Sequence, residues 1–394
     1  MELSKENTPL HQNYNVLTII LFWCGLVVVA SNYLTIPLMS IFSEVFHTSI
    51  TNVAWTGSAF SLCYAAGSLF SGPLSDRFGR KQVMFTGLLM LTISTLAVPT
   101  FSNLSWVIAL RSIQGFAAAS FAPVAIAYVV DKFPAQKRVT TIGFISSSFL
   151  ISAIAGQIFS SYISQQFGWQ SVFYYSASIY LITAVLVLLL LPKIDIQQAN
   201  NKLKTMFQQF QTLLTDKSLI QAYSIAITLL LSFVAFYTVL GDYLTETFSL
   251  NEDGILYVRM VGIIGMLVAP FAGKLANKYN LLTVLHGGLA VGVIGIFIVG
   301  VSTNLFLLVT MSVVFVAGIA ITVPTLISLV GHLGGKNHGA AVSLYAFILF
   351  IGTSLGPIVA VFLLKTESYM IAFLLLTLIL GIGLIISFFI TNGR

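Results

Sequence analysis

Long apolar runs constrain this chain more than any other feature. A helix needs about 20 apolar residues to cross the roughly 30 Å hydrocarbon core of a bilayer. Twelve runs of about that length occur along the 394 residues, at 16–42, 53–74, 82–100, 104–130, 139–165, 170–191, 219–247, 254–276, 281–301, 304–330, 339–364 and 369–390. We therefore expect an all-α polytopic membrane protein with twelve transmembrane helices, because helices satisfy their own backbone groups in lipid.

Composition agrees with a chain that is solvated by lipid. Only 8% of the residues are charged and 57% are hydrophobic, whereas about a quarter of the residues in a soluble domain are charged. The net charge of +6 could suggest a nucleic-acid partner. The basic residues, however, lie in short loops between apolar runs and not on a soluble face. We expect the lipid bilayer as partner, and no nucleic acid.

The Lys and Arg residues predict the orientation. If both termini lie on one side, that side carries fifteen of them: Lys5, Arg77, Arg80, Lys81, Lys132, Lys137, Arg138, Lys193, Lys202, Lys204, Lys217, Lys274, Lys278, Lys336 and Arg394. The other side carries Arg259 and Lys365, and Arg111 lies within a run. The positive-inside rule therefore places both termini in the cytoplasm of a multi-pass protein in the inner (plasma) membrane.

The chain divides into two related halves. A polar stretch at 192–217 reads as a cytoplasmic linker between six-helix halves at 1–191 and 218–394. Three short segments recur 200 to 210 residues later: 32–35 as 242–245, 72–78 as 273–279, and Gly156 as Gly356. Each match lies on the corresponding run of its half, which predicts a parallel internal repeat.

Three motifs suggest a family. Residues 72–81 read G-P-L-S-D-R-F-G-R-K, residues 111–119 read R-S-I-Q-G-F-A-A-A, and residues 167–173 read F-G-W-Q-S-V-F. Together with twelve spans they resemble signatures of the major facilitator superfamily and of its twelve-span drug:H⁺ antiporter branch. Residues 156–161 depart from that branch, since G-Q-I-F-S-S lacks its proline and glycine pair. The resemblance implies two pseudo-symmetric six-helix bundles.

The turn after the second run is expected to be a conformational latch. Its residues are Gly72, Asp76, Arg77, Gly79, Arg80 and, at the end of the fourth run, Asp131. Gly72 allows two helices to approach and Gly79 allows a sharp reversal. Asp76 can lie at a neighbouring helix N-terminus, and Asp131 is the expected partner of the basic residues. The alternative is that these basic residues only enforce topology.

Arg111 is an ionisable residue inside a span, which costs about 2.5–3.5 kcal/mol on insertion scales. We expect it to face a central cavity together with Gln114, which lies on the same helix face. The alternative is that Arg111 extends to the outer interface.

Asp242 is the deepest predicted carboxylate, and Glu246 lies one turn farther out. An acid in a low-dielectric cavity can bind and release protons near neutral pH, so we predict that these two residues couple transport to protons. The alternative is a static ion pair between Arg259 and either acid.

Further candidates complete a substrate-binding cavity. They are Asn32, Tyr33, Ser61, Tyr64, Gln157, Tyr243 and Arg259, with Arg111 and Gln114. Ordinary packing between helices is the alternative for the uncharged members. His286, His332 and His338 are expected to be solvated.

These features predict a proton-coupled exporter of a drug-like or amphipathic small molecule, working by alternating access. The runner-up is a dedicated exporter of an anionic metabolite, such as a siderophore or metallophore, that uses Arg111 and Arg259. Import of a nutrient and sensing without flux are weaker alternatives. No nucleotide-binding loop, catalytic constellation or metal-ligand cluster is found in the sequence. We expect a monomer that needs no cofactor or metal and is not an enzyme.

Overall fold

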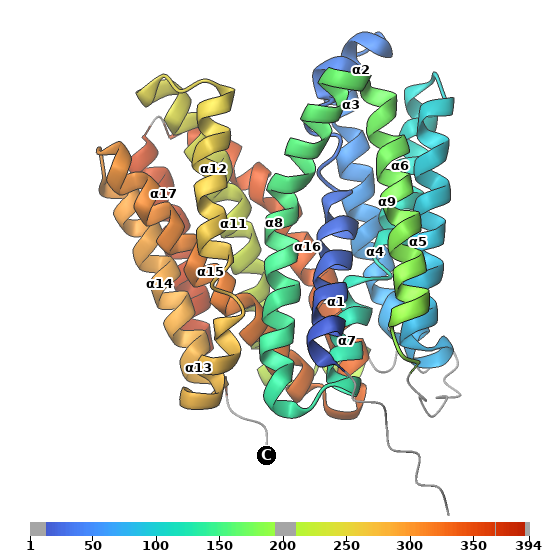
Figure 1. Cartoon of the computed structure of the whole chain (residues 1–394). Helices are drawn as coiled ribbons and strands as arrows, with labels where there is room; N and C mark the ends of the chain where they lie inside the picture. Colours follow the sequence, from blue (N-terminus) through green and yellow to red (C-terminus); the bar gives the residue numbers. More distant parts are fainter. Residues whose placement is uncertain (1–12, 194–209, 367, 391–394) are drawn as a thin grey trace, which may run out of the picture.

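The computed structural model describes residues 13–193, 210–366 and 368–390, which fold into helices joined by short turns (Figure 1). The N-terminal half contains α1 (Tyr14–Ala30), α2 (Met39–Val45), α3 (Ile50–Val53), α4 (Trp55–Phe78), α5 (Arg80–Ala97), α6 (Leu104–Ala118), α7 (Ala122–Lys132), α8 (Ala135–Phe167) and α9 (Trp169–Leu190). The C-terminal half contains α11 (Lys217–Phe248), α12 (Glu252–Met266), α13 (Phe271–Tyr279), α14 (Leu281–Val301), α15 (Leu305–Leu333), α16 (His338–Leu364) and α17 (Tyr369–Ser387).

The predicted membrane fold is confirmed. Within the described residues, ten helical segments are long and apolar enough to cross a membrane, and α1 is a shorter apolar helix. The remaining predicted span is α4, whose glycine, serine and charged residues lower its hydropathy. It packs inside the protein against α6 and α16. The linker assigned to 192–217 lies mostly outside the described residues.

Several spans are interrupted, which the apolar runs did not predict. The first span is irregular between α1 and α2, the fourth breaks between α6 and α7, and the eighth between α12 and α13. Proline lacks the N–H that would bond the carbonyl four residues earlier. Pro123 thus frees the Ala119 carbonyl, which accepts a hydrogen bond from the Ser71 hydroxyl at 2.8 Å. Lipid has no hydrogen-bond donor for this carbonyl, so the serine on the neighbouring span satisfies it.

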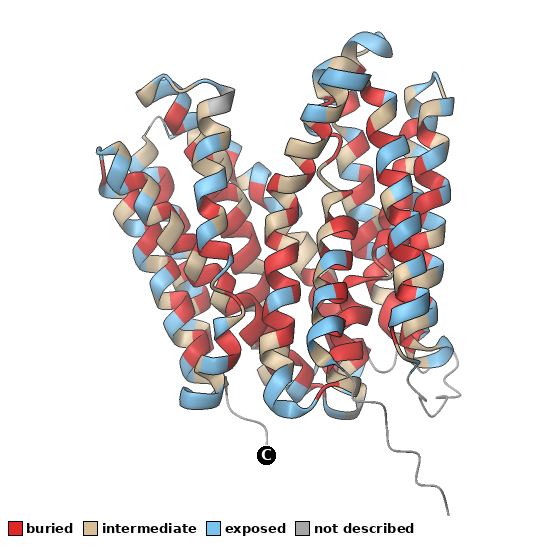
Figure 2. Ribbon diagram, viewed as in Figure 1, coloured by how far each residue is buried: buried red, intermediate tan, exposed pale blue. Residues whose placement is uncertain are grey.

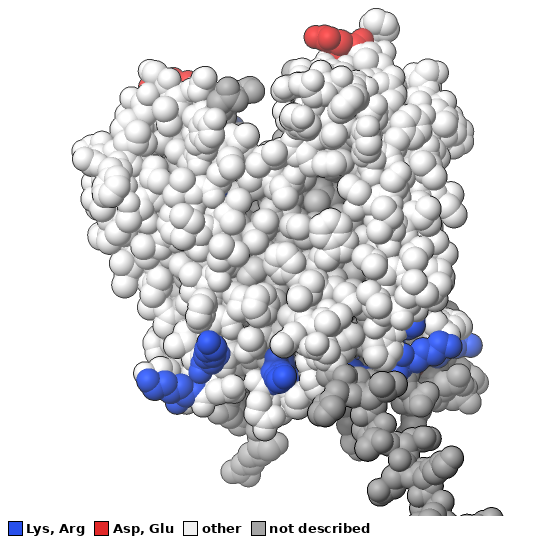
Figure 3. Space-filling model, viewed as in Figure 1, with Lys and Arg blue, Asp and Glu red and all other residues white. Residues whose placement is uncertain are grey.

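The surface is that of a membrane-spanning protein. Apolar side chains such as Ile93 (68% exposed) and Phe306 (81% exposed) lie on its outside, and exposed residues follow the outward helix faces in Figure 2. In Figure 3, Lys and Arg form a band at one end, here called the basic face, and the visible Asp and Glu lie at the opposite face. Lys5, Lys202, Lys204 and Arg394 lie outside the described residues. The chain is a multi-pass membrane protein.

The halves touch closely toward the basic face, where two glycines remove side chains from the contact. A Cβ on Gly72 of α4 would lie 2.6 Å from the Gly339 carbonyl oxygen of α16, and one on Gly273 of α13 would lie 2.8 Å from the Thr140 Cα of α8. These glycines occupy equivalent places in the repeat. Toward the opposite face, the surface is hollowed between the halves (Figure 3).

Candidate functional site

A cavity lies between the two halves. Helices α1, α4, α7 and α8 line it from one side, and α11, α15 and α16 from the other. Its polar lining residues are Tyr33, Tyr64, Ser146, Tyr345 and Thr353, and the remainder are Val29, Ala122, Pro123, Ile126, Phe149, Leu150, Ala153, Leu230, Phe233, Val234, Val323, Ile327, Ala346, Leu349 and Phe350. No charged side chain occurs in this described lining. The cavity encloses about 100 Å³.

Three hydroxyls in the cavity have no hydrogen-bond partner among the described residues. They belong to Tyr64, Ser146 and Tyr345, whose exposures are only 1%, 1% and 2%. Buried polar groups are nearly always paired. The ring of Tyr64 also packs against Phe350 across the halves, with centroids 4.1 Å apart and planes inclined at 30°. The cavity therefore offers apolar surface and three free hydroxyls.

Only two of the residues predicted for this cavity line it, Tyr33 and Tyr64. The Ser61 hydroxyl donates to the Asn32 side-chain oxygen at 2.9 Å, so these two satisfy each other beside the cavity. The Gln157 amide donates to the backbone of its own helix, at Ala153 O, at 2.7 Å.

Tyr243 lies inside the C-terminal half. Its ring packs on Tyr369, with centroids 4.6 Å apart, and its hydroxyl donates to the Ser302 carbonyl oxygen at 3.4 Å. It does not belong to the cavity lining given above.

Arg111 is fully buried inside the N-terminal half. Its guanidinium donates to Ser31 O at 2.9 Å, Thr56 O at 3.1 Å and Gln114 Oε1 at 2.7 Å, and it lies 4.3 Å from the Phe60 ring centroid. The prediction that Arg111 and Gln114 line the central cavity is wrong, and so is the alternative that Arg111 reaches the interface. Carbonyl oxygens and an aromatic face solvate the cation instead.

Asp242 is exposed, so the expectation of a deep, desolvated carboxylate is wrong. It accepts a 2.8 Å hydrogen bond from the hydroxyl of Tyr369, the first residue of α17, which places it toward one end of the bundle. Glu246 is exposed as well. Arg259 forms no ion pair within the described residues, so the predicted alternative of a static pair is also wrong; its Nε is buried without a partner.

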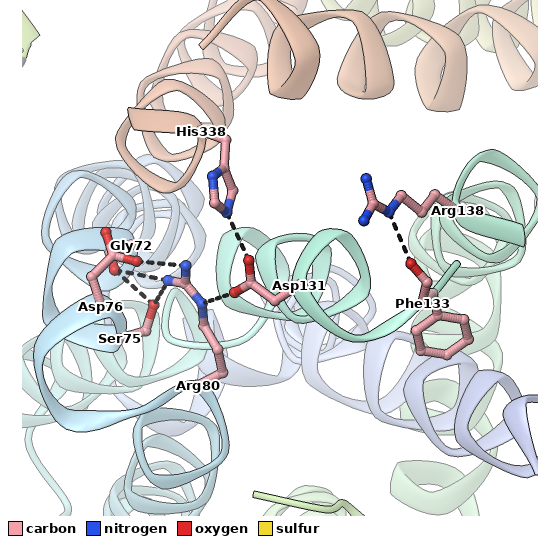
Figure 4. Close-up of polar contacts among 8 residues, drawn as sticks. All are labelled: Gly72, Ser75, Asp76, Arg80, Asp131, Phe133, Arg138 and His338. Carbon is pink, nitrogen blue, oxygen red and sulfur yellow. Dashed lines mark hydrogen bonds and ion pairs between the residues drawn. The ribbon is translucent and has the colours of Figure 1, made fainter. Parts of the chain in front are cut away.

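The predicted latch residues meet at the basic face (Figure 4). Arg80, at the start of α5, is only 3% exposed. Its guanidinium pairs with Asp76, donates to Asp131 at 3.0 Å and to the Gly72 carbonyl oxygen at 3.3 Å, and also bonds Ser75. Asp76 lies against Gly339 near the N-terminus of α16, where unpaired N–H groups favour a carboxylate.

Gly79 and Arg77, the two remaining residues of the predicted latch, make no ion pair in this cluster. Gly79 joins α4 to α5 with φ +95°, a conformation that favours glycine. Arg77 is exposed and lies over the ring of its neighbour Phe78, 5.3 Å from the centroid. The structure does not bring Arg77 into the cluster.

His338, in the C-terminal half, contacts the cluster of the N-terminal half. Its Nε2 lies 3.1 Å from Asp131 Oδ1, joining α16 to α7. The expectation that His338 is merely solvated is wrong, since its side chain is only 21% exposed. Its position at the start of the eleventh span was the available signal, because Asp76 was expected to meet a helix N-terminus. We call Asp76, Arg80, Asp131 and His338 the charged latch.

A second contact closes the basic face where α8 meets the break between α12 and α13. Ser147 donates to the Met266 carbonyl oxygen at 3.0 Å, and the Asn277 amide donates to Gln136 O at 3.4 Å. Asn277 is the repeat counterpart of Asp76. This contact therefore joins the halves through uncharged groups.

Sequence reasoning missed Ser146, Tyr345 and Phe350 in the cavity. Ser146 stands in a run of three serines in the middle of an apolar span. Such a polar cluster was a usable signal. Tyr345 and Phe350 resemble many other aromatic residues in the chain, and only their contacts distinguish them.

Comparisons with known proteins agree with this geometry. The sequence profile described as Major Facilitator Superfamily matches residues 21–338. An uncharacterized transporter of Buchnera aphidicola subsp. Schizaphis graminum is 25% identical over 355 residues, covering 90% of this chain and 85% of that protein. Multidrug resistance protein 2 of Bacillus subtilis is 23% identical, covering 89% of this chain and 90% of the relative.

Among solved structures, the fucose:proton symporter FucP of Escherichia coli has the same fold, with a TM-score of 0.79 at 15% identity. The match covers 96% of this chain and 100% of the symporter. The profile match spans most of the chain, and the two repeated helical halves enclose a cavity between them. The chain belongs to the Major Facilitator Superfamily.

Proposed function

We propose that this protein is a secondary active exporter of a small molecule that works by alternating access and is driven by protons. The observation that carries the proposal is the cavity between two repeated halves, which meet at the basic face and separate at the other. A site at the interface of two repeats can be exposed to each side in turn as they rock. The charged latch would hold one of the two states.

We propose that the basic face is cytoplasmic and that the membrane is the plasma membrane. The band of Lys and Arg in Figure 3 supports this orientation through the positive-inside rule, and the relatives named above are bacterial. The structure then corresponds to an outward-facing state with its cytoplasmic side closed.

Asp242 is the residue proposed to take up the driving proton, with Glu246 as the second candidate. An outward-facing carrier must load its proton from outside, and Asp242 is exposed in this state. The Tyr369 hydroxyl is its partner, and no ion pair with a cation is found among the described residues. Its repeat counterpart, Asn32, cannot titrate, so only one half carries the ionisable group.

The geometry favours a drug-like or amphipathic substrate over an anionic metabolite. The runner-up required Arg111 and Arg259 in the cavity, but Arg111 is bonded inside one half and neither residue lines the cavity. The name of the Bacillus relative, a multidrug resistance protein, supports the same choice.

Inside-out vesicles containing a luminal pH dye test the proposal. Once respiration has acidified the lumen, an exported compound should enter in exchange for protons and raise luminal pH. Vesicles without the protein are the control. Failure of every compound in a broad panel to move protons or accumulate would reject proton-driven export.

A further inference from the structure

We infer that the substrate is a small, uncharged aromatic compound that accepts hydrogen bonds from the Tyr64, Ser146 and Tyr345 hydroxyls. This rests on the proposed function, because it takes the central cavity as the transport site. It specifies the substrate more narrowly than a drug-like molecule, and it excludes ions, including the anionic metabolites that the sequence had suggested.

The described lining of the cavity carries no charge. The described lining has neither a carboxylate for a cation nor a guanidinium or ammonium for an anion. The Arg111 guanidinium already donates hydrogen bonds to Ser31 O, Thr56 O and Gln114. Asp242 lies outside the cavity lining and accepts a hydrogen bond from Tyr369. An ion that left water for this cavity would lose its hydration without an opposite charge, which is strongly unfavourable. A neutral ligand avoids that penalty.

Three hydroxyls in the cavity, those of Tyr64, Ser146 and Tyr345, have no partner among the described residues. They come from α4, α8 and α16, so both halves contribute, and all three side chains are at least nine-tenths buried. A hydroxyl donates through one O–H and accepts through its lone pairs. A ligand carbonyl could receive these protons, whereas a purely apolar ligand would leave three buried groups unpaired. The cavity therefore selects for a polar, neutral group on the substrate.

The shape of the cavity suits an aromatic ring. The rings of Tyr64 and Phe350 pack on each other across the halves with their planes inclined at 30°, and Phe149 and Phe233 add apolar surface. Aromatic rings pack favourably in offset-stacked and tilted arrangements. The enclosed 100 Å³ is on the scale of a cavity that accepts one benzene ring. A one-ring compound thus matches this state of the protein.

Benzamide, benzamidine and benzoate test the inference, because they have nearly the same shape but are neutral, cationic and anionic. Their dissociation constants for the purified full-length protein in nanodiscs can be measured by ligand-observed saturation-transfer NMR. We expect benzamide to bind at least about tenfold more tightly than either ion. Equal or tighter binding of an ion, or no binding of benzamide, would overturn the inference. Proton-coupled flux of other compounds in vesicles would still stand in that case.

Hydroxyl deletions locate the bound benzamide. Tyr345→Phe and Ser146→Ala each remove one free hydroxyl and should weaken binding about five- to tenfold, since a hydrogen bond is lost. Tyr237→Phe is the matched control, because its hydroxyl is also buried without a partner but lies outside the cavity lining. Thermal unfolding verifies that each variant folds, and either deletion alone suffices. Equal benzamide affinity in the control and both deletions would refute the placement.

Discussion

At the scale of single residues, Arg111 acts as a clamp. Its guanidinium joins the irregular segment after α1, through Ser31 O, to the first turn of α4, through Thr56 O, and to Gln114 on its own helix. Hydrogen bonds from a charged donor contribute about 1.5–3 kcal/mol each when buried. The clamp therefore stabilises the interrupted first span, where the backbone lacks a regular helical ladder.

Arg111→Lys should lower the unfolding free energy by roughly 2–3 kcal/mol, because an ammonium cannot reach all three acceptors with the geometry of a guanidinium. Arg77→Lys is the control and should change stability by less than about 0.5 kcal/mol, since Arg77 is exposed. Thermal unfolding of the purified variants measures both. If Arg111→Lys were as stable as the control but no longer bound substrate, Arg111 would belong to the binding site after all.

The position of Arg111 could not be predicted from the sequence. Its place within an apolar run indicated a charge that lipid cannot solvate, but not which groups of the protein would solvate it. Those partners are backbone carbonyls, which every residue carries, so no side chain in the sequence identified them. Conversely, Ser61 and Tyr64 were both named as cavity candidates, and their spacing of three residues already places them on one helix face. Local spacing is visible in a sequence, whereas partners from distant spans are not.

Asp242→Asn should abolish uphill, proton-driven accumulation while leaving substrate affinity within about twofold. The reason is that the carboxamide cannot titrate, and Asp242 lies outside the cavity lining. Adding Arg259→Gln should not restore accumulation, because the two residues form no ion pair. Accumulation ratios in vesicles and binding titrations measure the two effects. Wild-type accumulation by Asp242→Asn would transfer the proposed role to Glu246.

At the scale of helices, the repeat produces two equivalent contacts at the basic face. Gly72 of α4 meets α16, and Gly273 of α13 meets α8. The first contact is reinforced by the charged latch and the second by the uncharged Ser147 and Asn277 bonds. The same close helix contact thus occurs twice, once with charged side chains around it and once with uncharged ones.

Gly72→Ala and Gly273→Ala should each open the basic face. An added methyl would lie 2.6 Å from a facing backbone atom at Gly72 and 2.5 Å from one at Gly273, well inside van der Waals contact. Electron–electron distances between spin labels at Arg77→Cys and Lys278→Cys should lengthen in both variants. Gly287→Ala is the control, since a Cβ there meets nothing within 4 Å. Unchanged distances in both glycine variants would show that the helices do not need this close approach.

The helices themselves were largely predictable, because a span requires about 20 apolar residues whatever its neighbours are. The interruptions were not. Pro123 and Pro270 lie inside continuous apolar runs, and hydropathy alone does not register a missing N–H. The carbonyls freed beside them are compensated by Ser71 and Ser147 from other spans, so the breaks become stable only in the assembled bundle.

At the scale of the whole molecule, the charged latch makes the balance between states depend on ionic strength. The charged groups that face His338 are Asp131, at 3.1 Å, and Asp76, with Arg80 between the two carboxylates. Asp131 and Asp76 both lie against the start of α16, through His338 and Gly339. The ion pairs with Arg80 that hold these two carboxylates in place therefore favour the state with the basic face closed. Ion pairs that are partly exposed are also weakened by salt.

Raising the salt concentration should accordingly lower the population of the closed basic face. Single-molecule energy transfer between dyes at Arg77→Cys and Lys278→Cys, recorded from about 0.01 M to about 1 M salt, measures the populations. Asp131→Asn should remove most of the salt dependence, because the carboxamide keeps the size of the side chain but carries no charge. Ser147→Ala is the control, since it weakens the uncharged contact between the halves and should leave the salt dependence in place. A salt dependence that persists unchanged in Asp131→Asn would place the responsible charges elsewhere.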